Sequence, residues 1–465
     1  MIYIKTRSRR YLDVSLRDTH GLNALDRLKI NECCSNIKVI KDLMKVLRKK
    51  GDTQRYGKIK ALLKLEVFNL LRIVVVDLPD RPNLRQKFKG HTFVSMEAHL
   101  LSIGVSVSER FRFQSFDQLQ RLLRGFCFPT VFIILKKGYR IKAEELIMIS
   151  LTRLAFPARW SDLYERFPGR KRWFLRSAFY WFLDFMITNW GYLLLNNMEY
   201  WKPSLAASCE AIRLKLMNLN WPHWRQFHPP ATEPGGFRYA GFIDNTMFAF
   251  SRPGGNTDGG SAAPRVPKEI QQAWYTGWKK LHGMKWQTVI LANGMDLHVF
   301  GPLSVRKNDL TSLELSKFEE QFAQLQQGSD IILKIFGDSA YFDNDYLGTG
   351  GGRGMASCRE TVEWTYKDDK GQWKYCDYKH VLQLRGQPVA KIMFICLLLR
   401  NAYVTLNGSQ VSEYLVMMPP SFEEWVSHGP QARPLPSNSI FSRNYVYEDD
   451  SDEEYDSDEE YDDAH

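Results

Sequence analysis

The order of apolar segments in the second half of this 465-residue chain constrains its fold most strongly. Asn293-Gly294, a strong signal for a tight hairpin turn, separates two strand-like runs. The predicted elements, in chain order, are a strand, a hairpin, a helix, a largely apolar strand and two helices, at residues 239–250, 286–300, 310–325, 331–336, 357–370 and 389–406. This order predicts an α/β domain with a mixed sheet over residues 237–425.

Three carboxylates stand in or after these elements. Asp244 lies in the first strand, Asp338 follows the apolar strand, and Glu363 lies in the helical segment after a glycine-rich loop. Side by side, they would offer the hard oxygen ligands that Mg²⁺ and Mn²⁺ prefer. Three carboxylates share a small volume only if cations neutralise them, and two metal ions would activate the attacking oxygen and stabilise the leaving one. The pattern predicts two-metal phosphoryl transfer on DNA.

Three nearby residues have open interpretations. Glu360 stands one helical turn before Glu363 and competes with it for the third ligand position. Asp309 is either a further site residue or the N-cap of the helix at 310–325. The N-cap is the simpler of these two explanations. His282 is either a structural or phosphate-contacting group or, less simply, a catalytic one.

The charge balance predicts a polyanionic partner. The chain has 63 Lys and Arg against 52 Asp and Glu, a net charge of +11. Residues 448–465 hold twelve acids and no Lys or Arg, so the rest of the chain carries +23. Lysines and arginines on phosphates release counterions and strengthen DNA binding at any base sequence. An interaction scaffold without a nucleic acid partner leaves this charge unexplained.

Cysteine usage and hydropathy bear on the expected cellular compartment of the protein. Its seven cysteines form an odd set without a Cys-x-x-Cys pair, which argues against a disulfide framework and structural zinc. We find no uncharged apolar run near the ~18 residues of a spanning helix, and no apolar core of signal-peptide length at the start. We expect a soluble protein without a membrane partner, located in the nucleus and possibly also in the cytoplasm.

Residues 136–205 follow a helix-turn-helix pattern. An apolar helix, a proline break, a short helix at 160–167 and a Pro-Gly-Arg turn precede a long aromatic helix. Four basic residues cluster where a recognition helix would meet the major groove, namely Arg170, Lys171, Arg172 and Arg176. The alternative is a helical bundle in which the aromatic helix is core.

The remaining segments are less informative. Residues 1–135 contain a basic cluster at 48–50 that suits an import signal, a DNA-backbone contact or a solvated helix face. Residues 206–236 end in a Pro- and Gly-rich run, which predicts a linker. Residues 426–465 are predicted as a linker and a disordered acidic tail, which either screens the DNA-binding surface, more so if Ser451 or Ser457 is phosphorylated, or only solubilises the protein.

Five short blocks after residue 239 resemble the catalytic domain of Harbinger-type transposases, in the DDE superfamily. Asp244-Asn245-Thr246 resembles the family's Asp-Gly-Thr, and residues 337–341 its Gly-Asp-x-x-Tyr. The other blocks are residues 275–287 (Tyr-x-Gly, then His-Gly-x-Lys-x-Gln), 301–309 (Gly-Pro, then Asn-Asp for His-Asp) and 359–363 (Arg-x-x-x-Glu). The sequence departs at Asn245 and Asn308, and only 24 residues separate Asp338 from Glu363.

The resemblance implies a ribonuclease-H-like fold in which Asp244, Asp338 and Glu363 bind two Mg²⁺ or Mn²⁺ ions and catalyse DNA cleavage and strand transfer. Transposon ends and target DNA would be the partners, with a Myb-like accessory protein and a homo-oligomer as further possibilities. Residues between aromatic side chains are predicted as additional DNA contacts, namely Lys279, Lys280, His282 and Lys285. The alternative function is that of a domesticated, inactive, transposase-derived DNA-binding protein.

Overall fold

The computed structural model divides the chain into two compact units, Met1–Gly90 and His91–His465. It describes residues 2–5, 11–14, 36, 39–48, 52–53, 55–56, 58–60, 95–103, 106–130, 132–135, 139–167, 169–195, 197–227, 237–252, 268–327, 332–350, 352–377, 382 and 387–430. The acidic tail lies outside the described residues. In the first unit, β1 (Ile2–Lys5) and β2 (Tyr11–Val14) pair antiparallel, and residues 39–48 are helical.

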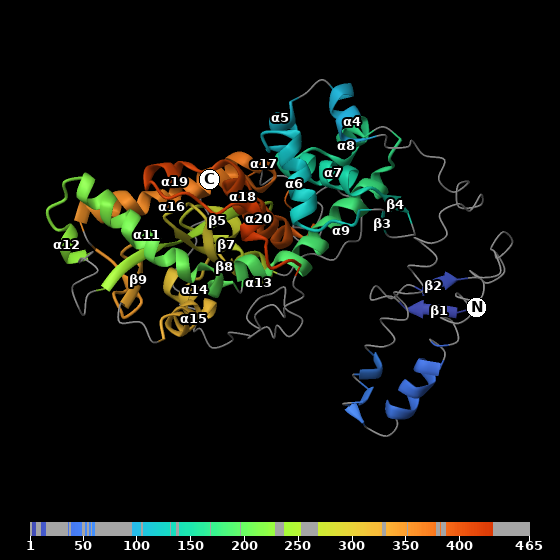
Figure 1. Ribbon diagram of the computed structural model, residues 1–465, viewed down its shortest axis with the longest axis horizontal. Helices are drawn as coiled ribbons and strands as arrows, with labels where there is room; N and C mark the ends of the chain where they lie inside the picture. The colour runs from blue at the N-terminus through green and yellow to red at the C-terminus, as the bar shows by residue number, and fades with distance from the viewer. Residues whose placement is uncertain are drawn as a thin grey trace. The chain divides into compact units, whose positions relative to one another are not determined.

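A six-stranded mixed sheet forms the centre of the second unit (Figure 1). Its longest strand, β5 (Phe237–Phe250), pairs antiparallel with β7 (Leu281–Leu291) and parallel with β9 (Ile332–Phe336). The edge strands are β8 (Asp296–Ser304) and β6 (Tyr275–Thr276), both on β7, and β10 (Leu347–Gly348), which runs parallel to β9. The predicted α/β class with a mixed sheet is confirmed.

Helices cover both faces of the sheet. Figure 1 shows α16 (Gly352–Gln372) and α18 (Val389–Asn407) above the strands, with α14 (Asp309–Ser316) and α15 (Phe318–Leu325) below them. Two apolar clusters lie against the sheet. Phe242 of β5 shares one of them with Val362 of α16, and the next residue, Ile243, shares the other with Phe322 of α15. Successive strand residues point to opposite faces, so a strand covered on both faces needs a nearly continuous apolar run.

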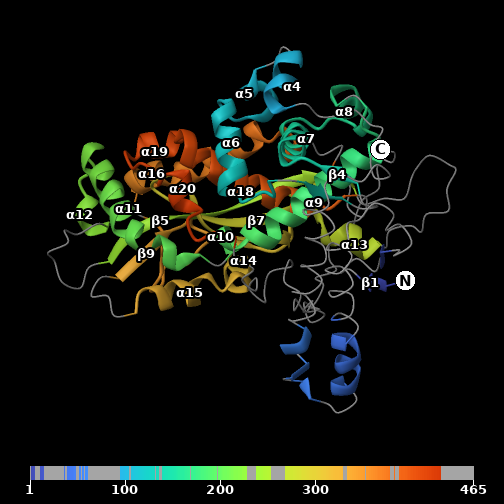
Figure 2. The ribbon, with the colours of Figure 1, turned by 45° about the vertical axis from the view of Figure 1, so that its right-hand side comes forward.

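The helices before the sheet follow the predicted pattern. They include α7 (Ala143–Ala155), α8 (Trp160–Arg166) and α9 (Arg172–Trp190), and α9 lies beside α7 and α18 (Figure 2). The other elements are α4 (Met96–Ile103), α5 (Val107–Phe111), α6 (Phe116–Gly125), β3 (Ile133–Ile134), β4 (Arg140–Ile141), α10 (Tyr192–Leu195), α11 (Met198–Asn218), α12 (Trp224–Phe227), α13 (Lys268–Ala273), α17 (Lys374–Asp377), α19 (Gln410–Tyr414) and α20 (Phe422–Trp425).

The core differs from the predicted division into regions. One apolar cluster runs from Met96 through α9 to the sheet and on to Val426, so residues 91–135, 136–205 and 237–425 share an interior. Residues 206–218, predicted as linker, belong to α11, where the Ser208 hydroxyl donates to the Ala240 carbonyl at 2.6 Å. Pro and Gly become frequent only from Pro222 onward. Local composition does not show which helices bury their apolar faces together.

Two local predictions are corrected around residues 308–325. The single predicted helix is two, because Lys317 has φ +55° and separates α14 from α15. Asn308, and not Asp309, caps α14, since its side chain accepts a hydrogen bond from the Thr311 amide at 2.7 Å. Asp309 is the first helical residue, and its carboxylate is therefore available for contacts elsewhere.

One helix in the described part of the chain, α18, is long and apolar enough to cross a membrane. Of its most apolar stretch, 72% is buried inside the protein. The helix also carries Arg400, whose guanidinium lies 3.3 Å from the buried Asp296 carboxylate. A core helix with an internal ion pair accounts for this apolar sequence.

Candidate functional site

The sheet register brings Asp244 and Asp338 to one level. Phe242 of β5 pairs with Phe336 of β9, and each aspartate stands two residues beyond that pair. Because the two strands are parallel neighbours, Asp244, in the middle of β5, lies beside Asp338, which follows the end of β9. The negative charge of Asp338 accordingly helps to raise the pKa of Asp244. The structure thus brings together two of the three predicted ligands.

The Asp244 carboxyl group is largely buried, with 17% of its side chain exposed. Its pKa is raised to about 6, chiefly by burial; the Asn245 amide and Arg359 oppose the rise, and the charges of Asp338 and Asp309 add to it. The Asn245 amide donates to Asp244 Oδ1 at 2.7 Å. Carboxylates crowded in this way favour a cation between them.

Arg359 supplies a cation at the position where α16 passes over β5. Its Nη1 lies 3.6 Å from Asp244 Oδ2, and its Nη2 lies 3.4 Å from Glu363 Oε1. The guanidinium therefore connects the first and third predicted ligands. Glu363 makes the contact with Arg359, and both Glu363 and Glu360 are exposed on this helix, so exposure does not distinguish them as ligands.

A polar network fixes the other side of the strand. Asn245 Nδ2 donates to Asp309 Oδ1 at 2.8 Å and to the Tyr341 hydroxyl at 3.0 Å. Lys285 Nζ donates to the same Asp309 oxygen at 3.1 Å and to the Lys307 carbonyl. These bonds tie the start of α14 and the loop after Asp338 to β5 and β7. The sequence-based site omitted Asn245 and Tyr341, although both fall inside the motif blocks.

The donor atoms fit a hard divalent cation in their chemistry. Asn245 Oδ1 is buried and has no hydrogen-bond partner within the described residues, so it adds a neutral oxygen to the carboxylates. Among all the residues that the structure describes, however, no three Asp, Glu, His or Cys side chains are grouped closely enough to hold a metal ion. Arg359 provides the positive charge between Asp244 and Glu363 here, and a metal ion would have to displace it.

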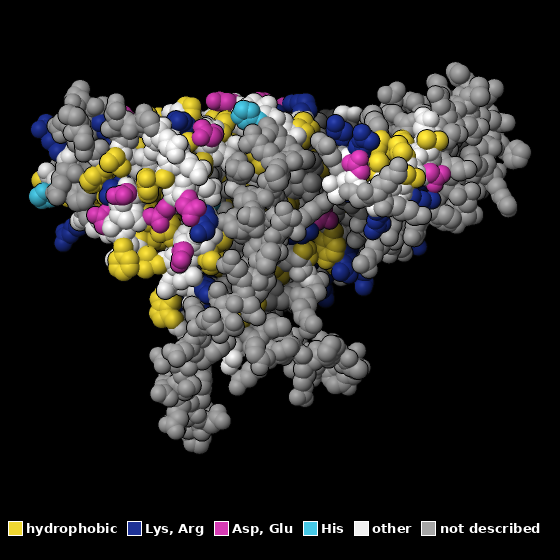
Figure 3. Space-filling view, turned by 90° about the horizontal axis from the view of Figure 1, so that it is seen from below, with side chains coloured by type: hydrophobic (Ala, Val, Ile, Leu, Met, Phe, Trp, Pro, Cys, Tyr) yellow, Lys and Arg dark blue, Asp and Glu magenta, His cyan; other side chains and the backbone are white. Residues whose placement is uncertain are grey.

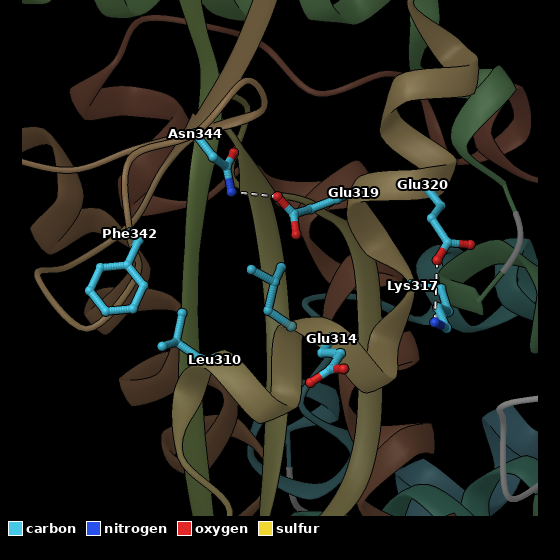
Figure 4. Close-up of a pocket in the computed structure, with 8 residues that line it drawn as sticks. Leu310, Glu314, Lys317, Glu319, Glu320, Phe342 and Asn344 are labelled. Atoms are coloured by element: carbon cyan, nitrogen blue, oxygen red, sulfur yellow. Dashed lines mark hydrogen bonds and ion pairs between the residues drawn. The ribbon is translucent and has the colours of Figure 1, made fainter.

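A pocket of about 260 Å³ opens beside this network (Figure 4). Leu310 and Phe342 line one side of it, next in sequence to Asp309 and Tyr341. Three glutamates line the other side, and two of them are engaged, Glu319 with Asn344 at 2.6 Å and Glu320 with Lys317 at 3.2 Å. This excess of carboxylates repels phosphate groups, so the pocket does not suit a DNA backbone.

Arg170 and Lys285, both predicted as DNA contacts, make internal ion pairs instead. Arg170 Nε lies 2.6 Å from Glu145 Oε1, with side-chain exposures of 17% and 3%. Lys285 is bound to Asp309, as described above. A buried carboxylate needs a partner, and each of these cations supplies one. By contrast, the basic residues at the start of α9 that were predicted with Arg170 are exposed, namely Lys171, Arg172 and Arg176.

The remaining predicted DNA contacts lie at the turn between β6 and β7. Lys279 and Lys280 are exposed at its tip. His282 is half-buried, with its ring centroid 5.0 Å from that of Tyr275, and burial together with Arg252 lowers its pKa. It therefore favours the neutral form, which suits the structural interpretation more than a phosphate contact.

Charge is mixed on the face shown in Figure 3. Among its described residues, Lys and Arg side chains alternate with acidic and hydrophobic ones and do not form one broad patch. A DNA contact on this face would therefore use local groups of cations.

Comparisons with known proteins agree with the carboxylate site in one segment. No curated protein and no solved structure matches the chain. Residues 257–401, just under a third of the chain, match the family model described as DDE superfamily endonuclease. The matched segment contains Asp338 and Glu363 and begins after Asp244. This part of the chain is therefore similar to the DDE superfamily endonucleases.

Proposed function

We propose that the protein is a metal-dependent DNA endonuclease and strand transferase of the Harbinger transposase type. One observation carries the proposal: adjacent parallel strands place Asp244 and Asp338 at one level, and Arg359 connects Asp244 to Glu363. The family match over residues 257–401 supports the same chemistry.

The sheet topology adds support for a ribonuclease-H-like domain. The strands β8, β7 and β5 are antiparallel neighbours, and β5, β9 and β10 are parallel neighbours. A central strand with the first aspartate, a parallel neighbour with the second, and a covering helix with the glutamate is the arrangement expected of that fold.

Asp244, Asp338 and Glu363 would hold the divalent cations. Bound Mg²⁺ or Mn²⁺ ions supply Lewis acidity, which activates the attacking oxygen and stabilises the leaving one. The chain itself orients the ligands. The Asn245 amide holds one Asp244 oxygen, and the Ala340 amide holds Asp338 Oδ1 at 2.9 Å. The other Asp338 oxygen remains for a cation, whereas Asp244 Oδ2 faces Arg359 and would bind a cation once Arg359 is displaced.

DNA would contact the exposed cations at the start of α9, Lys171, Arg172 and Arg176, as in a helix-turn-helix. Transposon ends and target DNA are the proposed partners, with a Myb-like accessory protein and a second copy of the chain as further proposals. We also propose a nuclear location, since the substrate is there.

The second candidate is an inactive DNA-binding descendant of such a transposase. One observation favours it, because Arg359 already supplies the charge that a metal ion would bring between Asp244 and Glu363. In that case the carboxylates serve stability and do not bind metal.

Nicking of supercoiled plasmid with Mg²⁺ or Mn²⁺ separates the two candidates. We expect the wild-type protein to nick, and Asp244→Ala, Asp338→Ala and Glu363→Ala to abolish nicking. The matched controls are Glu360→Ala, one turn from Glu363, and Asp343→Ala, whose side chain is 66% exposed five residues after Asp338. Both controls should remain active. A wild-type protein that binds DNA without nicking it would favour the inactive descendant.

A further inference from the structure

The turn between β6 and β7 exposes a tryptophan to an unusual extent. Trp278 is 83% exposed, more than any other aromatic side chain in the described residues, whereas Trp286 on the adjoining strand is fully buried. A large apolar ring held in water gains none of the burial that stabilises a core. Trp278 therefore has no packing role in this unit.

Two lysines flank the exposed ring. Lys279 Nζ lies 4.9 Å from the centre of the Trp278 ring, and Lys280 is exposed beside it. Lys280 adopts φ +49°, and its amide donates to the Gly277 carbonyl at 3.3 Å, which closes the turn. The four residues 277–280 thus present one aromatic face and two positive charges together.

The turn is anchored to the sheet. Tyr275 pairs with His282 and Thr276 with Leu281, and the Gly283 amide donates to the Trp274 carbonyl at 2.9 Å. Trp274 packs in turn on Phe250 of β5, with ring centres 5.9 Å apart. A binding group on such a support loses little conformational freedom when it meets a ligand.

The chemistry of the turn fits DNA that is partly unpaired. Exposed bases stack on aromatic rings, and lysines beside the ring neutralise the adjoining phosphates. In an intact duplex the bases are already stacked on each other, so the ring gains most where pairing is broken. An acidic protein partner would also meet the lysines, and the experiment below tests for it.

The sheet register relates the turn to the carboxylates. Asp244 pairs with Thr288 on β7, and Lys280 stands eight residues before Thr288. At about 3.3 Å per strand residue, the turn lies roughly 26 Å from the level of Asp244. That distance corresponds to about 8 base pairs at ~3.4 Å each, less than one turn of the duplex. DNA lying along the strands from the carboxylates would therefore reach Trp278.

We propose that residues 277–280 form a DNA-binding site in which Trp278 stacks on an unpaired base and Lys279 and Lys280 bind the flanking phosphates. This inference rests on the proposed function in taking DNA as the ligand and, for the distance to the cleaved bond, in placing cleavage at the carboxylates. It predicts a contact within one helical turn of the cleaved bond, separate from the α9 cations.

The test measures binding without divalent metal, so cleavage does not enter. Fluorescence anisotropy in EDTA would compare a fully paired duplex with the same duplex carrying a short unpaired stretch that contains 2-aminopurine. We expect Trp278→Ala to weaken binding to the unpaired form by about 5- to 150-fold, the range for loss of one stacked base, and to change the 2-aminopurine signal. Lys279→Ala/Lys280→Ala should reduce the slope of log binding constant against log salt concentration by about 2, the equivalent of two lost phosphate contacts.

The matched control is Met418→Ala, since Met418 is 81% exposed elsewhere on the unit. It should leave binding unchanged, and thermal unfolding should show that all variants fold. Wild-type affinity in Trp278→Ala would overturn the inference, and so would an equal loss on both DNAs without a 2-aminopurine change. If the wild-type protein still nicks plasmid in that case, the inference about residues 277–280 is wrong while the proposed nuclease function stands. A wild-type protein that binds neither DNA refutes both proposals and leaves an acidic partner as the explanation of the turn.

Discussion

Replacing Arg170 tests whether the basic cluster before α9 is structural or binds DNA. The Arg170 guanidinium holds Glu145 through two hydrogen bonds, Nε to Oε1 at 2.6 Å and Nη2 to Oε2 at 2.7 Å. It also stacks on Phe174, with its central carbon 4.5 Å from the ring centre. Arg170→Ala removes these contacts and leaves the Glu145 carboxylate, 3% exposed, without its partner.

The expected loss of stability follows from that burial. Removing one partner of a buried ion pair costs about 3–5 kcal/mol, because the remaining charge stays desolvated. With an unfolding entropy of ~2 cal/mol/K per residue over the roughly 290 described residues of His91–His465, this lowers Tm by about 5–9 °C. Arg172→Ala, an exposed control two residues away, should change Tm little.

The loss should also depend on pH. Burial raises the pKa of Glu145, and Arg170 limits that rise. Without Arg170 the folded-state pKa rises further above the unfolded value, so the folded state binds more protons and stability falls as pH increases through this window. The defect of Arg170→Ala should therefore be larger at pH 8 than at pH 5.

Thermal unfolding at both pH values, with DNA-binding anisotropy below Tm, measures these effects. Folded Arg170→Ala should bind DNA with nearly wild-type affinity, whereas Arg172→Ala should bind more weakly. Glu145→Gln/Arg170→Ala should recover part of the lost stability. An unchanged Tm in Arg170→Ala together with a large loss of DNA affinity would refute the structural role of this arginine.

Two further predictions concern the sheet and the site. Burial lowers the pKa of His298 to about 4, so the unfolded state binds the proton first as pH falls below ~6.5, and stability should drop by about 3 kcal/mol down to pH 4. Urea unfolding should show a flatter pH profile in His298→Phe, and an unaltered profile would contradict this. Without metal, Arg359→Ala should lower the free energy of unfolding by only about 1 kcal/mol, because the ion pairs of Arg359 are partly exposed. Added Mn²⁺ should raise the Tm of this variant by more than it raises that of the wild type. An equal or smaller gain would show that Arg359 does not compete with metal.

The elements of the sheet could be predicted from local patterns. Largely apolar runs predicted β5 and β9, because the middle of β5 and the end of β9 are buried, and Asn293-Gly294 predicted the β7–β8 turn, where Gly294 has φ +80°. Asp244 and Asp338 were found by the same means, since each is a polar residue in or just after an apolar strand.

The sequence could not predict which charged and polar side chains pair with each other. Arg170 and Glu145 are 25 residues apart, and Asn245 and Asp309 are 64 apart, so no local pattern relates them. The same basic residue suits a phosphate or a buried carboxylate equally well, and only burial distinguishes the two.

The sequence alone determined the order of strands and helices, the positive charge of the body and the presence of three carboxylates, because these depend on residue type and short-range periodicity. Only the tertiary structure decided that Arg359 stands between Asp244 and Glu363, that Asn308 caps α14 in place of Asp309, and that Trp278 is exposed while Trp286 is buried. These outcomes depend on strand register and on how helices pack over the sheet, and that packing joins residues far apart in the chain.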